Sequence, residues 1–310
     1  MARQKQPSFI DLPRASLDDL AGVSIAVLGA SEASPYPFEK RSHSASAPRV
    51  LREVSQGIAA SLNQHDFDTG LTMFPDKHDR RGMVDCGDVR TDVADAEGNR
   101  RRIRRAVRRI LKAGAVPILL GGDDSVPIPF LAAYEGFGPI TIVQIDAHVD
   151  WADVISGNPY GYGSPMRRAS EYPWVTGMVQ VGIRGLGSGQ QWQHDDARSW
   201  GSHLVTSYDL HAEGLEAALR HVPEGSKVVF SIDCDGIDPA VLPAVNMPTP
   251  GGLGYEDMVG LIRGIAGKAL IVGLALLEYV PERDDRHRLS GLVAARLACV
   301  AMALIGATVG

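Results

Sequence analysis

Short apolar runs alternate with amphipathic segments along most of the chain. The runs are Val23 to Gly29, Val116 to Leu120, Pro139 to Ile145, Met178 to Gly182, Leu204 to Ser207, Lys227 to Ser231 and Ala269 to Ala275. Their length and their content of Val and Ile are typical of buried strands in a parallel sheet. Asp85 to Val89 is expected to form a further short strand or a turn.

Helical patterns lie between these runs. Between Asn99 and Lys112, apolar residues recur at intervals of three and four, which predicts an amphipathic helix. Further helices are expected from Ala47, near Glu213 to Arg220, over Tyr255 to Ile265 and in the apolar tail Leu292 to Val309. Alternating strands and helices indicate a doubly wound α/β fold, with one domain over residues 1–310 and an N-terminal arm at residues 1–22.

The helix over Asn99 to Lys112 carries arginines from Arg100 to Arg109, which alone resemble a nucleic-acid-binding patch. The apolar stripe indicates that one face of this helix packs inward, so the arginines form the opposite, solvated face. The helix dipole stabilises arginines near the carboxyl end. The net charge of −6 and the isoelectric point of about 5.8 give no reason to expect a nucleic-acid partner.

Composition is that of an ordinary soluble globular protein, with 45% hydrophobic and 22% charged residues. The three cysteines, Cys86, Cys234 and Cys299, are too far apart for a disulfide framework or a Cys-x-x-Cys zinc site, and fit a reducing compartment. Met1 to Pro13 lacks the apolar segment of a signal peptide, and no stretch reaches the roughly 18 continuous apolar residues of a membrane span. We therefore expect a cytoplasmic protein without a membrane partner, whose tail is a buried helix or a helix in a subunit contact.

Three acidic stretches follow three of the apolar runs. They are Gly121-Gly122-Asp123-Asp124-Ser125, Asp146-Ala147-His148-Val149-Asp150 and Ser231-Ile232-Asp233-Cys234-Asp235-Gly236-Ile237-Asp238-Pro239. In open α/β sheets, ligands bind beyond the carboxyl ends of the strands, so these stretches should meet at one rim. The side chains expected to converge there are Asp124, Asp146, His148, Asp150, Asp233 and Asp235, and the last strand delivers Glu278 to the same place.

So many carboxylates repel one another unless divalent cations neutralise them. Side chains alternate faces along a strand, so Asp146, His148 and Asp150 are expected to point one way, and Ala147 and Val149 the other. Asp233 and Asp235 share a face for the same reason, and Cys234 between them is interpreted as a buried structural thiol. A single aspartate at a strand end often only caps a helix, but three such clusters together predict a two-metal site.

Other glycine-rich and proline-rich stretches are assigned to turns and walls. Gly185-Leu186-Gly187-Ser188-Gly189 does not match the G-x-G-x-x-G pattern of dinucleotide-binding proteins. The loop from Gly157 to Pro165 lies where substrate recognition is usual. The rigid turn Pro248 to Gly252 is expected to wall the site.

The Asp146–Asp150 and Ser231–Asp235 stretches, with Asp238-Pro239 and Pro250-Gly251-Gly252, resemble signatures of the ureohydrolase family. This family includes arginase, agmatinase and enzymes that hydrolyse guanidino acids and guanidine, and the resemblance runs from about Val23 to the C-terminus. It implies a three-layer α/β/α sandwich with a mostly parallel eight-stranded sheet and assembly into trimers or hexamers. It also implies two divalent ions, Mn²⁺ or sometimes Ni²⁺, and a hydroxide that attacks the guanidinium carbon to release urea, or a urea-like product, and an amine.

The resemblance also assigns roles by position. Asp146 and Asp233 would bridge the two ions. Asp124 and Asp150 would complete one ion, and His148 and Asp235 the other. Glu278 would be the catalytic acid group that binds the guanidinium and steadies the departing amine.

Three positions depart from the family pattern. Asp124 stands where the family's Gly-Gly-Asp-His has histidine, which adds a negative charge but keeps a metal-capable oxygen. Tyr162-Gly163-Ser164-Pro165 stands in place of His-Gly-Thr-Pro, so a proton-carrying histidine is absent or supplied elsewhere. Pro243 to Pro248 differs from Pro-Gly-Thr-Gly-Thr-Pro, which reshapes the pocket wall. These changes argue against an ordinary arginase or agmatinase and suggest another guanidino compound, such as guanidine or a biguanide like metformin.

The first functional hypothesis is therefore a binuclear-metal hydrolase that cleaves a C–N bond of a small guanidino compound. The alternative is a non-catalytic or weakly active structural subunit of a hetero-oligomer. All six ligand positions keep a metal-capable group, which argues against that alternative. A deacetylase-like hydrolase would need a single-metal site with a His–His pair, which the sequence does not show.

Overall fold

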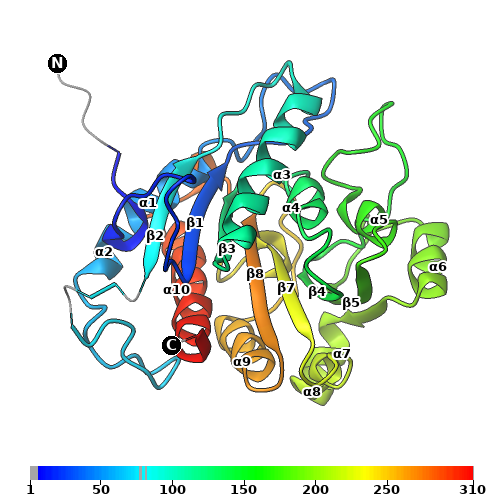
Figure 1. Cartoon of the computed structure of the whole chain (residues 1–310). Coiled ribbons are helices and arrows are strands. Elements are labelled where there is room, and N and C mark those ends of the chain that lie inside the picture. The colour runs from blue at the N-terminus through cyan, green and yellow to red at the C-terminus, as the bar shows by residue number, and fades with distance from the viewer. Residues whose placement is uncertain (1–5, 77–78, 81, 310) are drawn as a thin grey trace.

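One parallel sheet organises the chain in the computed structural model, which describes residues 6–76, 79–80 and 82–309. Within that part, eight strands pair in the order β2-β1-β3-β8-β7-β4-β5-β6, and each pair of neighbouring strands is parallel. The strands are β1 (Ile25–Ala30), β2 (Met83–Asp88), β3 (Val116–Gly121), β4 (Ile140–Ile145), β5 (Val175–Ile183), β6 (His203–Thr206), β7 (Lys227–Asp233) and β8 (Leu270–Leu277). Figure 1 shows β8 and β7 side by side at the centre of the sheet.

Helices cover both faces of the sheet, so the fold has three layers (Figure 1). One apolar core packs the sheet against α1 (Ala47–Val54), α7 (Ser207–Glu213), α8 (Glu216–Leu219), α9 (Tyr255–Ala266) and α10 (Leu289–Val309). The other packs it against α3 (Ala96–Lys112), α4 (Pro127–Ala132), α5 (Pro165–Ser170) and α6 (Gln191–Trp200). The short elements are α2 (Gln56–Ala59), η1 (Phe9–Asp11), η2 (Cys234–Gly236) and η3 (Pro281–Arg283). The predicted α/β/α sandwich is confirmed, with all eight strands parallel.

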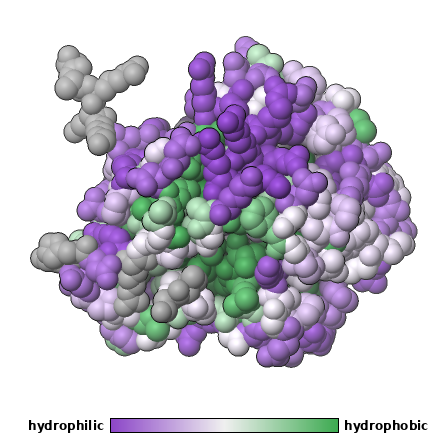
Figure 2. Space-filling model, in the orientation of Figure 1, coloured by the Kyte–Doolittle hydropathy of each residue, from purple (hydrophilic) through white to green (hydrophobic). Residues whose placement is uncertain are grey.

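The arginine-bearing helix α3 is amphipathic, as its periodicity predicts. Ile103, Val107 and Ile110 are fully buried against the sheet, whereas Arg101 and Arg104 are exposed. Figure 2 shows hydrophilic residues gathered over this helix. Arg101 pairs with Glu97 on the same helix, and Arg104 pairs with Glu135. The arginine run is a solvated face, with ion pairs to neighbouring carboxylates.

The apolar tail forms α10. By length and composition, its segment Leu289–Thr308 could span a membrane. However, 67% of the most apolar 18-residue stretch of this helix is buried inside the fold. It packs against α9, α1 and β8. Arg296 does not face an apolar surface, because its guanidinium pairs with Asp66 and with Asp68 at 2.8 Å.

Candidate active site and metal centre

Four adjacent strands deliver the acidic residues. Strands β3, β8, β7 and β4 are neighbours in the sheet, and their carboxyl ends lead directly into the predicted site segments. Asp124 follows β3, Glu278 follows β8, Asp233 ends β7, and Asp146 follows β4. The order of these strands in space explains why segments more than 100 residues apart meet at one rim.

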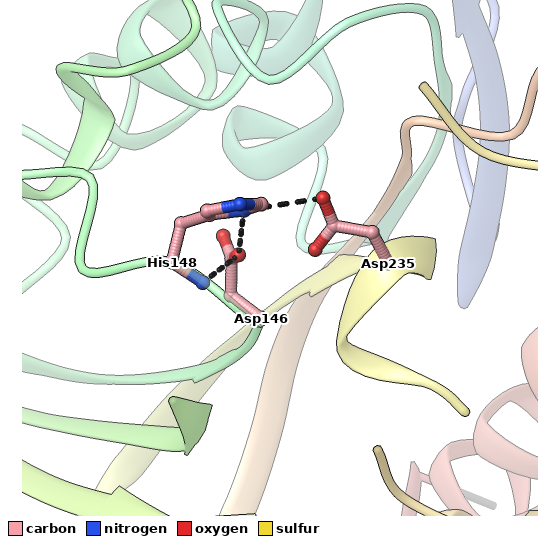
Figure 3. A group of neighbouring side chains, drawn as sticks. All are labelled: Asp146, His148 and Asp235. Carbon is pink, nitrogen blue, oxygen red and sulfur yellow. Dashed lines mark hydrogen bonds and ion pairs between the residues drawn. The ribbon is translucent and has the colours of Figure 1, made fainter. Parts of the chain in front are cut away.

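Two groups of ligand-type atoms lie close together. Asp146, His148 and Asp235 form one group, and Asp124, Asp146 and Asp233 form the other, with the ligand atoms of each group within 4.8 Å of one another. In the first group His148 Nδ1 lies 3.2 Å from both Asp146 Oδ1 and Asp235 Oδ2 (Figure 3). Asp146 belongs to both groups, which suits a carboxylate shared by two ions.

Asp150 completes the cluster through a shared donor. The amide of Gln144 donates to Asp146 Oδ2 at 2.6 Å and to Asp150 Oδ2 at 3.0 Å. Gln180 in turn donates to Gln144 Oε1 at 2.6 Å. The structure therefore brings all six sequence-predicted ligand residues and Glu278 to one place.

The expected reason for this convergence is wrong in one respect. Strand β4 ends at Ile145, and β7 gives way to the 3₁₀-helix η2 at Cys234, so strand alternation does not orient these side chains. Instead the backbone turns, and Asp150 adopts a left-handed conformation with φ of 53°. Cys234 is buried in the core, as expected, and burial raises the pKa of its thiol.

Close backbone packing requires glycine beside the site. A Cβ on Gly122 would lie 1.8 Å from the carbonyl oxygen of Ser31, and one on Gly236 would lie 2.6 Å from the amide nitrogen of Asp146. Arg184 supports the backbone of η2, because its buried guanidinium donates to the carbonyl oxygens of Asp235 at 2.7 Å and Gly236 at 3.1 Å.

Burial and mutual repulsion disfavour ionised carboxylates here. Burial first, and then the neighbouring carboxylates, raise the pKa of Asp124, Asp146 and Asp233 well above the ordinary value of 3.8. Burial opposes a charge on His148, but Asp146 and Asp235 outweigh it and raise its pKa to about 11. A cation bound among these groups would stabilise the ionised carboxylates and so lower their pKa values.

The residues present fit divalent ions. Both side-chain oxygens of Asp124 are buried and accept no hydrogen bond from any residue that the structure describes. Buried polar atoms without partners are rare in folded proteins, so this carboxylate is short of a positive partner. A donor set of carboxylate oxygens with one imidazole suits Mn²⁺ or another first-row divalent ion.

Glu278 is held by the backbone around it. Its amide donates to the carbonyl of Gly122 at 2.9 Å, and its Oε1 accepts from the amide of Asp124 at 2.8 Å. With φ of 62°, Glu278 is one of the few non-glycine residues with a left-handed backbone. Such conformations cost about 1–3 kcal/mol and gather at functional sites.

A cavity of about 220 Å³ opens onto the cluster. Its acidic wall is formed by Asp124, His148, Asp150, Asp233, Asp235 and Glu278, and the remaining wall includes Trp151, Ile155, Tyr162, Ser188, Gln193, Asn246 and Met247. The predicted substrate loop contributes Tyr162 and Gly163. The turn from Pro248 to Gly252 was expected to wall the site, but it is not part of the lining of this cavity. Its Thr249 carbonyl instead accepts from Arg184 at 2.7 Å.

Two residues at the site carry no signal in the sequence. Gln144 is one, since a glutamine inside an apolar strand carries no motif. The other is His43, from the loop between β1 and α1, whose imidazole contacts Glu278. It lies in a Ser- and Ala-rich stretch, 235 positions from its partner, so only the fold brings the two together.

Comparisons with known proteins agree with this geometry. The chain is 33% identical over 223 residues to an N(1)-aminopropylagmatine ureohydrolase of Thermus thermophilus, covering 69% of this chain and 71% of that protein. It is 32% identical over 250 residues to a guanidinobutyrase of Pseudomonas aeruginosa, covering 79% and 75%.

Solved structures show the same fold. Proclavaminate amidino hydrolase from Streptomyces clavuligerus superposes with a TM-score of 0.81 at 25% identity, covering 98% of both chains. A hypothetical agmatinase from Burkholderia thailandensis also gives 0.81, at 24% identity, covering 97% of this chain and 90% of that one. The model of the Arginase family matches residues 24–304, and the chain therefore belongs to the arginase family of ureohydrolases, whose members are metal-dependent amidinohydrolases.

Proposed function

We propose that this chain is a binuclear-metal hydrolase that cleaves a C–N bond of a small guanidino compound, giving urea or a urea-like product and an amine. The observation that carries the proposal is the single cavity in which metal-capable carboxylates and Glu278 face one another. Its relatives include ureohydrolases of agmatine-like and guanidino-acid substrates.

The chain's own residues would hold two ions, with Mn²⁺ favoured and Ni²⁺ the alternative. Asp146 and Asp233 would be shared, Asp124 and Asp150 would complete one ion, and His148 and Asp235 the other. When bound, such a pair of ions lowers the pKa of a water molecule toward about 7 and so supplies a nucleophile at neutral pH.

Glu278 would bind the guanidinium. A carboxylate accepts paired, charge-assisted hydrogen bonds from a planar guanidinium, which fixes the orientation of the carbon that is attacked. The buried position of Glu278, only 5% exposed, strengthens this interaction by excluding water. The same carboxylate would steady the amine as the C–N bond breaks.

The cavity wall narrows the substrate class. None of the described residues that line it is Lys or Arg. A substrate with a free carboxylate would find no cationic partner there and would face several aspartates instead. We therefore favour guanidino compounds without a carboxylate, such as guanidine, agmatine-like amines or biguanides, over arginine and guanidino acids.

A product-release screen tests the proposal. The purified chain is loaded with Mn²⁺ or with Ni²⁺ and incubated with guanidine, agmatine, biguanides, arginine and guanidino acids, while urea and amine are measured. We expect turnover of at least one substrate without a carboxylate, at a higher kcat/KM than for arginine or the guanidino acids. Turnover of none of them by the metal-loaded chain would contradict the proposal.

A further inference from the structure

His43 lies between three groups of the site region. Its Nε2 contacts Glu278 Oε2, and its Nδ1 lies 3.4 Å from Glu39 Oε1. Its ring stands edge-on to Tyr162, with centroids 5.4 Å apart and an angle of 78° between the ring planes. Glu278 and Tyr162 both line the cavity, whereas His43 is not among its lining residues.

We propose that His43 is a positioning residue that fixes Glu278 and Tyr162 together as the guanidinium-binding wall of the cavity. The inference rests on the proposed function, because it concerns the group that would hold the substrate. It also supplies a task for a histidine that no sequence motif identified.

Each oxygen of Glu278 is then held by one protein donor. The amide of Asp124 holds Oε1 at 2.8 Å, and His43 holds Oε2. A carboxylate oxygen has two lone pairs, so each oxygen keeps one for a substrate N–H group. Two donors leave the carboxylate little freedom to rotate, which is the condition for paired hydrogen bonds to a planar guanidinium.

The charge of His43 agrees with this geometry. Burial disfavours a charged imidazole, but Glu278 and Glu39 outweigh that effect and raise the pKa of His43 to about 10. The other titratable groups around the ring are Asp123, which favours its charge, and the phenol of Tyr162. At neutral pH both ring nitrogens therefore carry a proton, and both can donate at once.

Tyr162 has a second aromatic neighbour. Tyr36 packs edge-on against it, with centroids 4.5 Å apart, and the Tyr36 hydroxyl accepts from the amide of Gly163 at 3.2 Å. An aromatic side chain held beside a carboxylate suits a cationic ligand, which binds the ring face through a cation–π interaction. His43 is the residue that contacts both members of this wall.

Three substitutions separate the contacts. His43→Gln keeps a side-chain N–H donor for Glu278, His43→Phe keeps the aromatic ring against Tyr162, and His43→Ala removes both. Guanidinium chloride is titrated into each metal-loaded protein by calorimetry. We expect the Gln variant, which keeps the donor for Glu278 and loses only the ring contact with Tyr162, to bind guanidinium within about 3-fold of wild type. The Phe and Ala variants lose a hydrogen bond to a charged group, so their affinity for guanidinium should fall by roughly 10-fold or more.

His65 provides a matched control. It also stands edge-on to an aromatic ring, that of Phe67 at 5.0 Å, but it lines a separate cavity with Asp66 and Arg296. His65→Gln and His65→Phe should leave guanidinium affinity unchanged. Circular dichroism and thermal unfolding identify any variant that fails to fold, and the comparison with wild type then uses whichever of the Phe and Ala variants is folded.

The outcomes separate this inference from the proposed function. With an active substrate, the Phe and Ala variants should raise KM and lower kcat, and the Gln variant should restore both to within about 3-fold. If the wild type hydrolyses no guanidino compound, the proposed function fails, and the binding titration still decides the role of His43. Equal guanidinium affinity in wild type and the folded Phe or Ala variant overturns the inference.

Discussion

At the scale of single residues, the site depends on how each carboxylate is held. Glu278 and Asp150 have left-handed backbones, with φ of 62° and 53°, and both face the cavity. Both side-chain oxygens of Asp124 are buried and have no hydrogen-bond partner among the described residues. A fold that keeps strained and unpaired acids in one place maintains them for a ligand that compensates their cost.

The charge of Glu278 is the first property to test. In Glu278→Gln the shape is kept, but the attraction for a guanidinium is lost. A charge-assisted hydrogen bond contributes about 1.5–3 kcal/mol, so kcat/KM for the active guanidino substrate should fall roughly 10–100-fold. Metal content should stay at the wild-type value, as measured by elemental analysis. Unchanged kcat/KM would show that another residue binds the guanidinium.

Gln144 supports two of the proposed ligands. Gln144→Leu leaves Asp146 Oδ2 and Asp150 Oδ2 without the donor that orients them. Loss of a partner that orients metal ligands typically reduces metal affinity by about 10–100-fold, which Mn²⁺ titration by calorimetry would measure. Thr141→Val, at the other end of the same strand, serves as the control. Equal Mn²⁺ affinity in the Leu variant and wild type would exclude this supporting role.

At the scale of elements, the pattern of hydrophobic and polar residues predicts much of the fold. It predicts the chemistry of the site only in part. The strand from Val116 and the helix from Ala47 begin where the sequence predicts, because apolar runs and a proline at a helix start are local signals. The helix α6 over Gln191–Trp200 was not predicted, since it buries only Ala197 and has no apolar stripe. The helix expected near Glu213 to Arg220 is the short α8, and Gly214 separates it from α7, which the sequence did not indicate.

In the site, too, the features with a local sequence signal could be predicted and those that depend on tertiary contacts could not. Clusters at strand ends could be predicted from sequence because parallel strands finish at one edge. The turns that orient Asp146 and Asp235 could not, because they depend on contacts such as those of Arg184 with η2. His43 could not be found either, since its contact with Glu278 exists only in the folded chain.

A buried ion pair joins three elements near the edge of the sheet. Arg52 of α1 contacts Asp85 of β2 at 2.8 and 3.1 Å, and Asp85 also accepts from the amide of Phe9 at 2.7 Å. Both charged side chains are fully buried. Asp85→Asn leaves Arg52 without its main partner and should destabilise the protein by about 3–5 kcal/mol in urea unfolding. Glu53→Gln, which breaks the exposed pair with Arg49, should change stability by less than about 1 kcal/mol.

The same pair predicts a pH dependence. Burial opposes ionisation of Asp85, but its hydrogen bonds and ion pair with Arg52 prevail and lower its pKa below the ordinary 3.8. Its stabilising contribution is therefore present above pH 3.8 and is lost as the pH falls through the folded-state pKa. Unfolding free energies measured between pH 6 and pH 2 should fall less steeply at the acid end in Asp85→Asn than in wild type. Parallel curves would contradict this assignment.

At the scale of the whole molecule, metal binding and folding should be coupled. Without metal, the raised pKa values of Asp124, Asp146 and Asp233 mean that the folded state holds protons that the unfolded chain releases at lower pH. Stability from these neutral acids is full below pH 3.8 and is lost as the pH rises through their folded-state pKa values. Divalent ions that bind the ionised carboxylates restore the stability of the folded state.

Thermal unfolding measures this coupling. A free Mn²⁺ concentration 1,000-fold above Kd adds about 4 kcal/mol to the folded state. The Tm should therefore rise with Mn²⁺, and the gap between the metal-loaded and metal-free proteins should widen from pH 6 to pH 8. Asp233→Ala should lose most of the Mn²⁺ effect. A wild-type Tm that does not respond to Mn²⁺ at either pH would argue against a metal site in the fold.

The proposed activity depends most directly on whether two ions bind within the carboxylate cluster. Anomalous X-ray diffraction at the manganese edge, from crystals grown with Mn²⁺, answers this in one map. We expect two peaks about 3.5–4 Å apart, both in contact with Asp146 and Asp233. A map with no anomalous peak among these side chains, at a Mn²⁺ concentration that saturates other ureohydrolases, would contradict it.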